Sequence, residues 1–151
     1  MRAILAIVPA ILILAACGSP DQDAPPVVDD PAPAASGATL ADFAGTWNNE
    51  VRLEGVAEPV SSRFVGSADG TGWVMNLEGR DPIPLRASVV GDSLITESET
   101  YESILRPGVS TRARSAMARN GNDAAGTVVV TYRTDAGDEV VRGTMRATRT
   151  P

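Results

Sequence analysis

The sequence predicts an all-β domain, an antiparallel up-and-down meander barrel of about eight strands, after a signal peptide and a linker. Apolar and polar residues alternate with a period of two along most of the chain from residue 40, as in strands with one buried face. Turn residues recur at the short, regular spacing of a meander. After the N-terminal apolar run, no segment has the pattern of a helix of ordinary length.

The first segment has the features of a secretion signal. Arg2 carries the positive charge, and the apolar run that follows, about a dozen residues long, is shorter than the ~20 residues of a membrane-spanning helix. The run ends in Leu14-Ala15-Ala16-Cys17, which resembles the lipobox of bacterial lipoproteins. The resemblance implies cleavage before Cys17, acylation of its sulfur and anchoring in a membrane. It also implies a location in the cell envelope, on the periplasmic or surface side of the outer membrane.

Three parts of the chain follow from these patterns. Residues 1–16 are expected to be the signal peptide, and residues 17–39 the lipidated cysteine with a disordered tether. The tether is rich in Pro, Asp and Ala and offers almost no apolar side chain to bury. Residues 40–151 are expected to form the barrel. Charges on its outward positions, such as Glu50 and Arg52, argue against the apolar outer band of a transmembrane barrel.

The barrel strands are expected between the turn signals. They cover residues 45–54, 59–67, 72–78, 83–90, 93–102, 108–118, 124–133 and 139–149. A closed barrel is favoured over an open sheet because closure leaves no exposed edge. Eight strands enclose an interior that side chains fill, or one that holds a single small ligand.

Composition excludes several functions. The net charge of −6 argues against nucleic-acid binding, because binding phosphates requires clustered positive charge. The chain has no His and one Cys, so it lacks a Ser-His-Asp triad, a Cys-His pair and an ordinary structural zinc site. We therefore expect no metal, no cofactor and no enzymatic activity. The remaining catalytic possibility is a hydrolase that uses two carboxylates, Glu97 and Glu99.

A motif opens the predicted domain. Residues 40–47, Leu-Ala-Asp-Phe-Ala-Gly-Thr-Trp, resemble the start of a lipocalin-like (calycin) domain. The resemblance implies that a short turn closes one barrel end, that Trp47 packs at the barrel base, and that an Arg of the last strand covers it. Arg142, Arg146 and Arg149 are candidates, and Arg146 is expected from its position. The Gly-Thr-Trp-Asn start is also similar to avidin, but biotin binding is not carried over because the aromatics around the biotin ring have no counterparts.

Four residues are candidates for a ligand site inside the barrel. Trp47, Asn49, Trp73 and Met75 are expected on the inner face, where they either fill the core or line an apolar pocket. Asn49 is the polar member, and it requires hydrogen-bond partners or a water if it is buried. It is the strongest indication of a polar site inside.

Arg112 and Arg114 are the candidates for a polar or anionic ligand. They share one face of a strand, and a turn at Pro107-Gly108 would set them opposite Glu97 and Glu99. One interpretation is a solvent-facing ladder of ion pairs, each contributing ~0.2–1 kcal/mol. The other is that these arginines turn inward or onto the barrel mouth and bind a ligand.

Together these features favour a membrane-anchored binding module for a small, partly apolar ligand or an envelope protein partner. The alternative is a structural accessory lipoprotein of the envelope with a filled barrel and no ligand. Whether the interior is hollow distinguishes the two.

Lipidation makes the first testable prediction. Labelled palmitate should enter the natural chain and should not enter the Cys17→Ser variant, because the acyl chains attach at that sulfur. The variant should also be lost from the membrane fraction. Ser19→Ala, a substitution two residues away, should keep both the label and the fractionation. Membrane fractionation of Cys17→Ser equal to that of the natural chain would contradict the lipobox interpretation.

Overall fold

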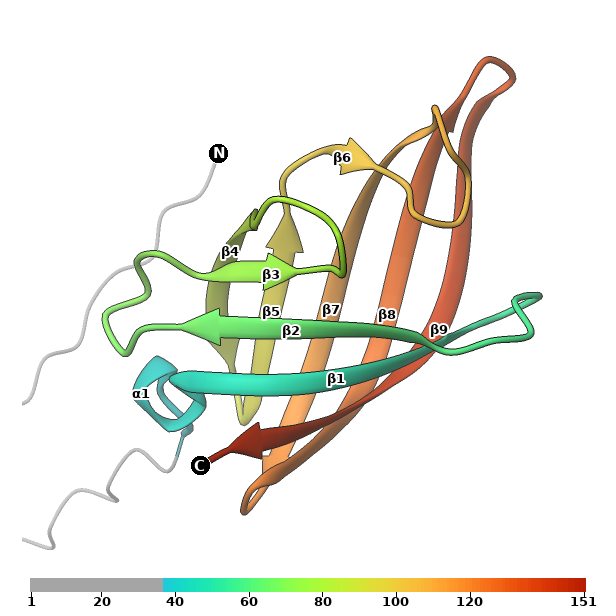
Figure 1. The fold of residues 1–151 in the computed structure, drawn as a ribbon. Helices are drawn as coiled ribbons and strands as arrows, with labels where there is room; N and C mark the ends of the chain where they lie inside the picture. The colour runs from blue at the N-terminus through green and yellow to red at the C-terminus, as the bar shows by residue number, and fades with distance from the viewer. Residues whose placement is uncertain (1–36) are drawn as a thin grey trace, which may run out of the picture. The chain divides into compact units, whose positions relative to one another are not determined.

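The computed structural model describes residues 37–151 (Figure 1). The expected signal peptide, Cys17 and nearly all of the expected tether lie outside the described residues, and their predictions stay predictions. Within residues 37–151, no helix has the length and apolar character needed to cross a membrane.

One short helix precedes nine strands. The elements are α1 (Leu40–Phe43), β1 (Gly45–Leu53), β2 (Val60–Gly66), β3 (Val74–Asn76), β4 (Ile83–Val90), β5 (Ser93–Ser98), β6 (Tyr101–Glu102), β7 (Ser110–Asn120), β8 (Asp123–Thr134) and β9 (Gly137–Thr150). The strand order is β5-β4-β3-β2-β1-β9-β8-β7-β6, and β5 also pairs with β7. Eight strands therefore close into an antiparallel up-and-down barrel, and the predicted fold class is confirmed.

The short strand β6 is a branch outside the closed ring. It pairs with β7 through Tyr101 and Glu102 only. The sequence predicted one strand over residues 93–102, and the structure divides it into β5 and β6. The backbone N–H of Glu99 still donates to the Pro84 carbonyl at 3.0 Å, and the ladder with β4 goes no further. Beyond that point the chain turns toward one end of the barrel.

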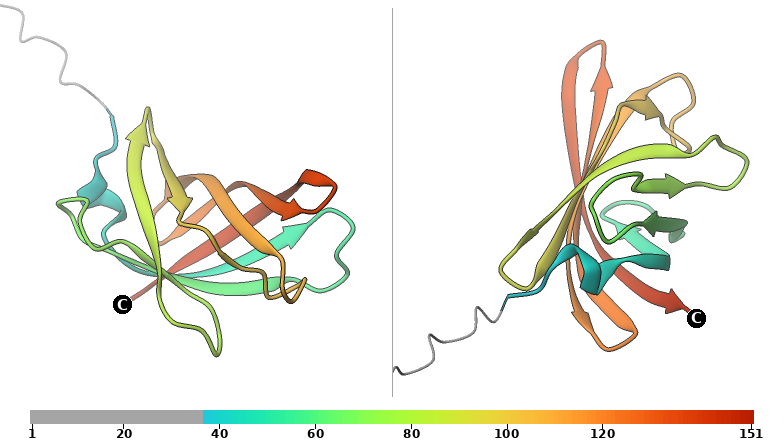
Figure 2. Two further views of the ribbon diagram at one scale, coloured as in Figure 1. Left: turned by 90° about the horizontal axis from the view of Figure 1, so that it is seen from above. Right: turned by 90° about the vertical axis from the view of Figure 1, so that its left-hand side faces the viewer.

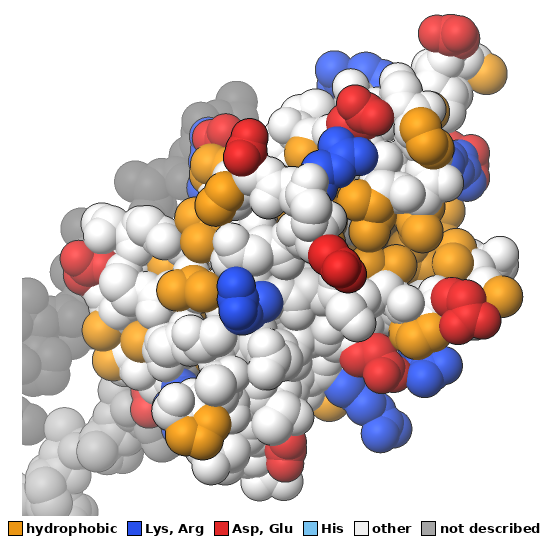
Figure 3. Space-filling view, viewed as in Figure 1, with side chains coloured by type: hydrophobic (Ala, Val, Ile, Leu, Met, Phe, Trp, Pro, Cys, Tyr) orange, Lys and Arg blue, Asp and Glu red, His pale blue; other side chains and the backbone are white. Residues whose placement is uncertain are grey.

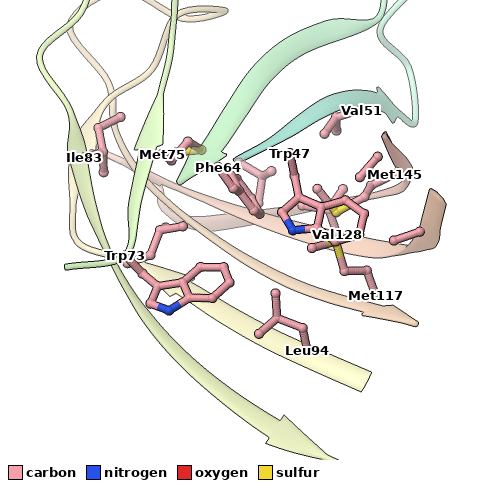
Figure 4. Close-up of a cluster of buried hydrophobic side chains, with 14 of the residues drawn as sticks. Trp47, Val51, Phe64, Trp73, Met75, Ile83, Leu94, Met117, Val128 and Met145 are labelled. Carbon is pink, nitrogen blue, oxygen red and sulfur yellow. The ribbon is translucent and has the colours of Figure 1, made fainter. Parts of the chain in front are cut away.

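The alternation predicted for the strands places their apolar positions inside the barrel. In β1, Trp47, Val51 and Leu53 are buried, and the residues between them face solvent. Side chains from several strands meet in the interior, as Figure 4 shows for the labelled residues. The interior is built largely from aliphatic and methionine side chains because the chain contains few aromatics.

Trp47 closes one end of the barrel. Its ring is fully buried, and its Nε1 donates a hydrogen bond to the Phe43 carbonyl of α1 at 2.7 Å. The Arg149 guanidinium lies 4.8 Å from the centre of the Trp47 ring and donates to the Asp42 carbonyl. Figure 2 shows α1 at this end of the barrel. A cation over an indole face is attractive and ties the last strand to the first.

The expectation that Arg146 covers Trp47 is wrong, and Arg149 has that place. In the β1–β9 ladder, Arg149 is opposite Trp47, whereas Arg146 is opposite Glu50. Residues three apart in a strand lie on opposite faces, so Arg146 faces solvent while Arg149 faces inward.

The β6–β7 loop (residues 103–109) lies toward the end of the barrel opposite α1 (Figure 1). The hydroxyl of Ser103 accepts hydrogen bonds from the backbone N–H groups of Leu105, at 3.1 Å, and Arg106, at 3.0 Å. The N–H of Gly108 donates to the Glu102 carboxylate at 3.1 Å. These local bonds satisfy the backbone of a loop that has no ladder partner.

An arginine clamp holds the β6–β7 loop onto the barrel. Arg106 donates two hydrogen bonds to the Glu139 carboxylate, each 2.7 Å long, and its guanidinium lies 4.2 Å from the centre of the Tyr132 ring. Two parallel bonds between a guanidinium and a carboxylate fix orientation as well as distance. The hydrogen bonds from Arg106 also lower the pKa of the Glu139 carboxyl.

Neutralising Glu139 should loosen this loop. In Glu139→Gln we expect hydrogen exchange of the Leu105, Arg106 and Val109 amides to rise roughly two- to fivefold, the range for one exposed ion pair. Asp138→Asn, an adjacent carboxylate, serves as the control and should leave exchange unchanged.

The same clamp makes the protection of the β6–β7 loop against hydrogen exchange depend on pH. Because the pKa of Glu139 is lowered in the folded protein, the clamp is complete above the ordinary glutamate value and is lost as the pH falls through the lowered value. Exchange in the natural protein should therefore approach that of Glu139→Gln only in acid. Equal loop exchange in both proteins at neutral pH would contradict the clamp.

Candidate functional site

A cavity occupies the barrel interior beneath the β6–β7 loop. It offers about 60 Å³ to the centres of water-sized molecules, whereas one water needs roughly 10–15 Å³ measured in this way. The empty space, counted together with the part that opens to solvent, is about 640 Å³. The interior is therefore hollow.

The wall of the cavity is mainly apolar. The strands contribute Val51, Leu53, Val60, Phe64, Met75, Leu77, Leu85, Ala113, Val128, Val130 and Met145, and the β6–β7 loop contributes Ile104 and Leu105. None of the described residues that line the cavity carries a charge. An apolar molecule in the cavity would bury apolar surface, at a gain of roughly 25 cal/mol for each Å².

Two tyrosines lie in the wall near the β6–β7 loop. Tyr132 is buried under the Arg106 guanidinium, and Tyr101 begins β6. Burial, and secondarily the neighbouring Tyr132, raises the pKa of Tyr101 to about 12. Tyr101 is therefore neutral at physiological pH and adds no charge to the site.

Hydroxyl groups provide the remaining polar surface of the wall. They belong to Ser62, Thr96, Ser103, Thr111 and Ser115. The hydroxyl of Thr111 donates to the Thr131 carbonyl at 2.9 Å, so its proton is used within the protein. Thr96 and Ser115 bond to each other at 2.7 Å. The site thus combines apolar contact area with a few hydrogen-bonding groups, as small-molecule pockets do.

The residues predicted to face inward are all buried, but they have different relations to the cavity. Met75 lines it. Trp47 and Trp73 are buried at 0% and 1% exposure without being part of its wall, because Trp47 belongs to the closed end and Trp73 packs against Gly66. A side chain at Gly66 would place its first carbon 2.1 Å from the Trp73 ring.

Asn49 is buried in the interior, with 4% exposure. Its Nδ2 donates a 3.4 Å hydrogen bond to the Ser62 hydroxyl, and its Oδ1 has no hydrogen-bond partner among the described residues. Asn49 is not part of the cavity wall, whereas Ser62 is. Asn49 therefore reaches the cavity only through Ser62.

Arg112 and Arg114 lie on the outer face of β7. Their neighbours Thr111 and Ser115 face inward, so the alternation of the strand turns both arginines to solvent. Arg114 is opposite Glu97 in the β5–β7 ladder, and its Nε lies 3.4 Å from the Glu97 carboxylate. Arg114 therefore follows the solvent-facing ion-pair interpretation, whereas Arg112 has no ion pair within residues 37–151. Neither arginine lines the cavity.

The two carboxylates considered for hydrolysis do not face each other across a pocket. Glu97 pairs with Arg114 on the outer face, and Glu99 is exposed beyond the end of β5. Over residues 37–151, no group of three or more His, Cys, Asp or Glu side chains is placed to hold a metal ion.

The hydroxyl groups of the wall and the role of the β6–β7 loop were not predicted from the sequence. The alternation in residues 93–98 carried the necessary signal, because it places Thr96 and Ser98 on the same face as Leu94, which is fully buried. No comparable signal marks Ile104 and Leu105, since a loop has no periodic face.

Apolar side chains also reach the surface beside the cavity. Leu105 is 38% exposed and lines both the cavity and a shallow surface depression with Val56, Val141 and Tyr132. Figure 3 shows apolar side chains gathered on this side of the barrel, where the β1–β2 and β6–β7 loops lie. Leu105 and Tyr132 therefore separate the cavity from this surface depression.

No family model matches the chain, and no curated protein matches its sequence. Among solved structures, a rhizavidin–biotin complex aligns with a TM-score of 0.45 and 15% identity over 76% of this chain and 98% of that chain. A second rhizavidin structure aligns with a TM-score of 0.41 and 14% identity over 75% of this chain and 90% of that chain. At these values neither structure assigns a family or a ligand to this chain.

Proposed function

We propose that this chain is a binding module whose barrel cavity holds a small, largely apolar molecule. The observation that carries the proposal is the hollow interior, with its apolar wall and uncharged lining. Protein interiors are closely packed, and voids larger than one water are few in a domain. A filled barrel would instead have favoured a structural accessory role.

A small ligand is favoured over a protein partner by the outer surface. Over residues 37–151, large apolar side chains are exposed at four positions, Val90, Ile104, Leu105 and Val140. Protein-binding surfaces are usually marked by wider apolar patches. Two of the four, Ile104 and Leu105, line the cavity as well, which is consistent with a ligand entrance.

The location of the module is also part of the proposal. The Leu14-Ala15-Ala16-Cys17 sequence supports acylation of Cys17 and hence anchoring in a membrane of the cell envelope. The Pro-rich segment up to residue 39 would then tether the barrel near that membrane. Apolar molecules are abundant at such a surface, so a module with an apolar cavity would meet its ligand there.

Blocking the cavity should abolish binding of an apolar probe. We expect toluene to shift the NMR methyl signals of Val128, Met145 and Leu85 in the natural protein and not in Ala113→Leu. Ala113 lines the cavity, so the larger side chain takes up its space. Ala118→Leu makes the same change at an exposed position of the same strand and should leave binding intact.

Thermal unfolding of both variants checks that they remain folded, since overpacking costs about 1–3 kcal/mol. If toluene causes no shift at these methyl groups in the natural protein, the proposed function is wrong. Equal binding by Ala113→Leu would contradict the cavity as the site.

A further inference from the structure

We infer that the cavity selects uncharged ligands that carry a hydrogen-bond acceptor, such as a carbonyl oxygen, and that the hydroxyl pair of Thr96 and Ser115 binds this atom. The inference rests on the proposed function of the cavity and adds the chemical class of its ligand. It follows from the hydrogen bonding of two buried hydroxyls and from the charges around them.

The hydroxyl pair lies where the barrel closes. Thr96 of β5 and Ser115 of β7 are directly opposite in the ladder, and both side chains point inward. Their exposures are 2% and 4%, their oxygens are 2.7 Å apart, and both residues line the cavity. They form a polar spot in a wall that is otherwise mainly apolar.

One of the two hydroxyl protons of this pair is free to donate a hydrogen bond. Two hydroxyls carry two protons, and the hydrogen bond between them uses one. The second proton has no acceptor among the described residues. A buried donor without an acceptor costs free energy, and proteins leave donors unpaired more rarely than acceptor lone pairs. A ligand oxygen beside the pair would satisfy this donor.

The surroundings of the pair disfavour a charged ligand. The charged neighbours on the same strands, Glu97 and Arg114, face outward and pair with each other at 3.4 Å. The described residues that line the cavity include no cationic side chain to pair with a ligand carboxylate and no anionic side chain to pair with a ligand amine. Burying a charge without a partner is strongly unfavourable. The wall therefore suits a neutral molecule with an oxygen at one position.

Three six-membered rings test the inference. Cyclohexanone carries an acceptor, cyclohexane carries none, and cyclohexanecarboxylate is charged. Binding of each to the purified protein is measured from the methyl shifts of Val128, Met145 and Leu85. We expect cyclohexanone and cyclohexane to bind and the carboxylate to cause no saturable shift at millimolar concentration.

The hydroxyl variants give the sharper result. Thr96→Val and Ser115→Ala each leave one hydroxyl whose proton remains free, so either single variant should still bind cyclohexanone. The double variant has no donor and should bind cyclohexanone roughly three- to tenfold more weakly, the range for one neutral hydrogen bond, with cyclohexane binding unchanged. Ser110→Ala, on the exposed face of β7, is the matched control and should behave like the natural protein.

The outcomes separate the inference from the proposed function. If both neutral rings bind and the double variant weakens them equally, or weakens neither, the hydroxyl pair does not select the ligand. Carboxylate binding as tight as that of cyclohexanone would also overturn the inference. If neither neutral ring shifts the cavity methyl signals in the natural protein, the proposed function itself fails.

Discussion

The pairing of β5 with β7 is the contact on which the rest of the structure depends. Residues Ser93–Glu97 join Ala118–Arg114 and turn a meander into a closed barrel, which leaves β6 outside the ring. Without this ladder the two strands would be exposed edges and their apolar inner positions would meet water. The same ladder brings Thr96 beside Ser115. Closure therefore creates the interior and also places its most distinctive polar group.

The two ends of the barrel are built differently, and the cavity lies next to only one of them. At one end Trp47, Phe43 and Arg149 pack into a solid base held by an indole hydrogen bond and a cation over an aromatic ring. At the other end a loop with no ladder partner is held by Arg106 and Glu139. The cavity lies beneath this loop, and Ile104 and Leu105 of the loop line it. The cavity is therefore bordered by the loop end of the barrel rather than by the solid base.

Much of the fold could be predicted from the sequence because a strand's faces alternate with a fixed period. The same rule would have identified Arg149, because Met145 and Ala147 alternate with Arg146 and Thr148, and Arg149 continues the apolar face of Met145 and Ala147. The division between β5 and β6 could not be predicted, because no Gly or Pro marks residues 99–100. Nor could the hollow interior, which depends on how side-chain volumes from eight strands add up in space. Polar residues occupy both faces of β7, so the sequence alone left the direction of Arg112 and Arg114 open.

The central claim is that the closed barrel contains an apolar space, and xenon tests it most directly. Xenon enters apolar cavities in proteins and has no need of hydrogen bonds or charge. In crystals of the protein under xenon pressure, we expect a xenon atom inside the barrel, against Val51, Val128 and Met145. An interior with no xenon, in which the side chains have closed together and filled the space, would contradict it.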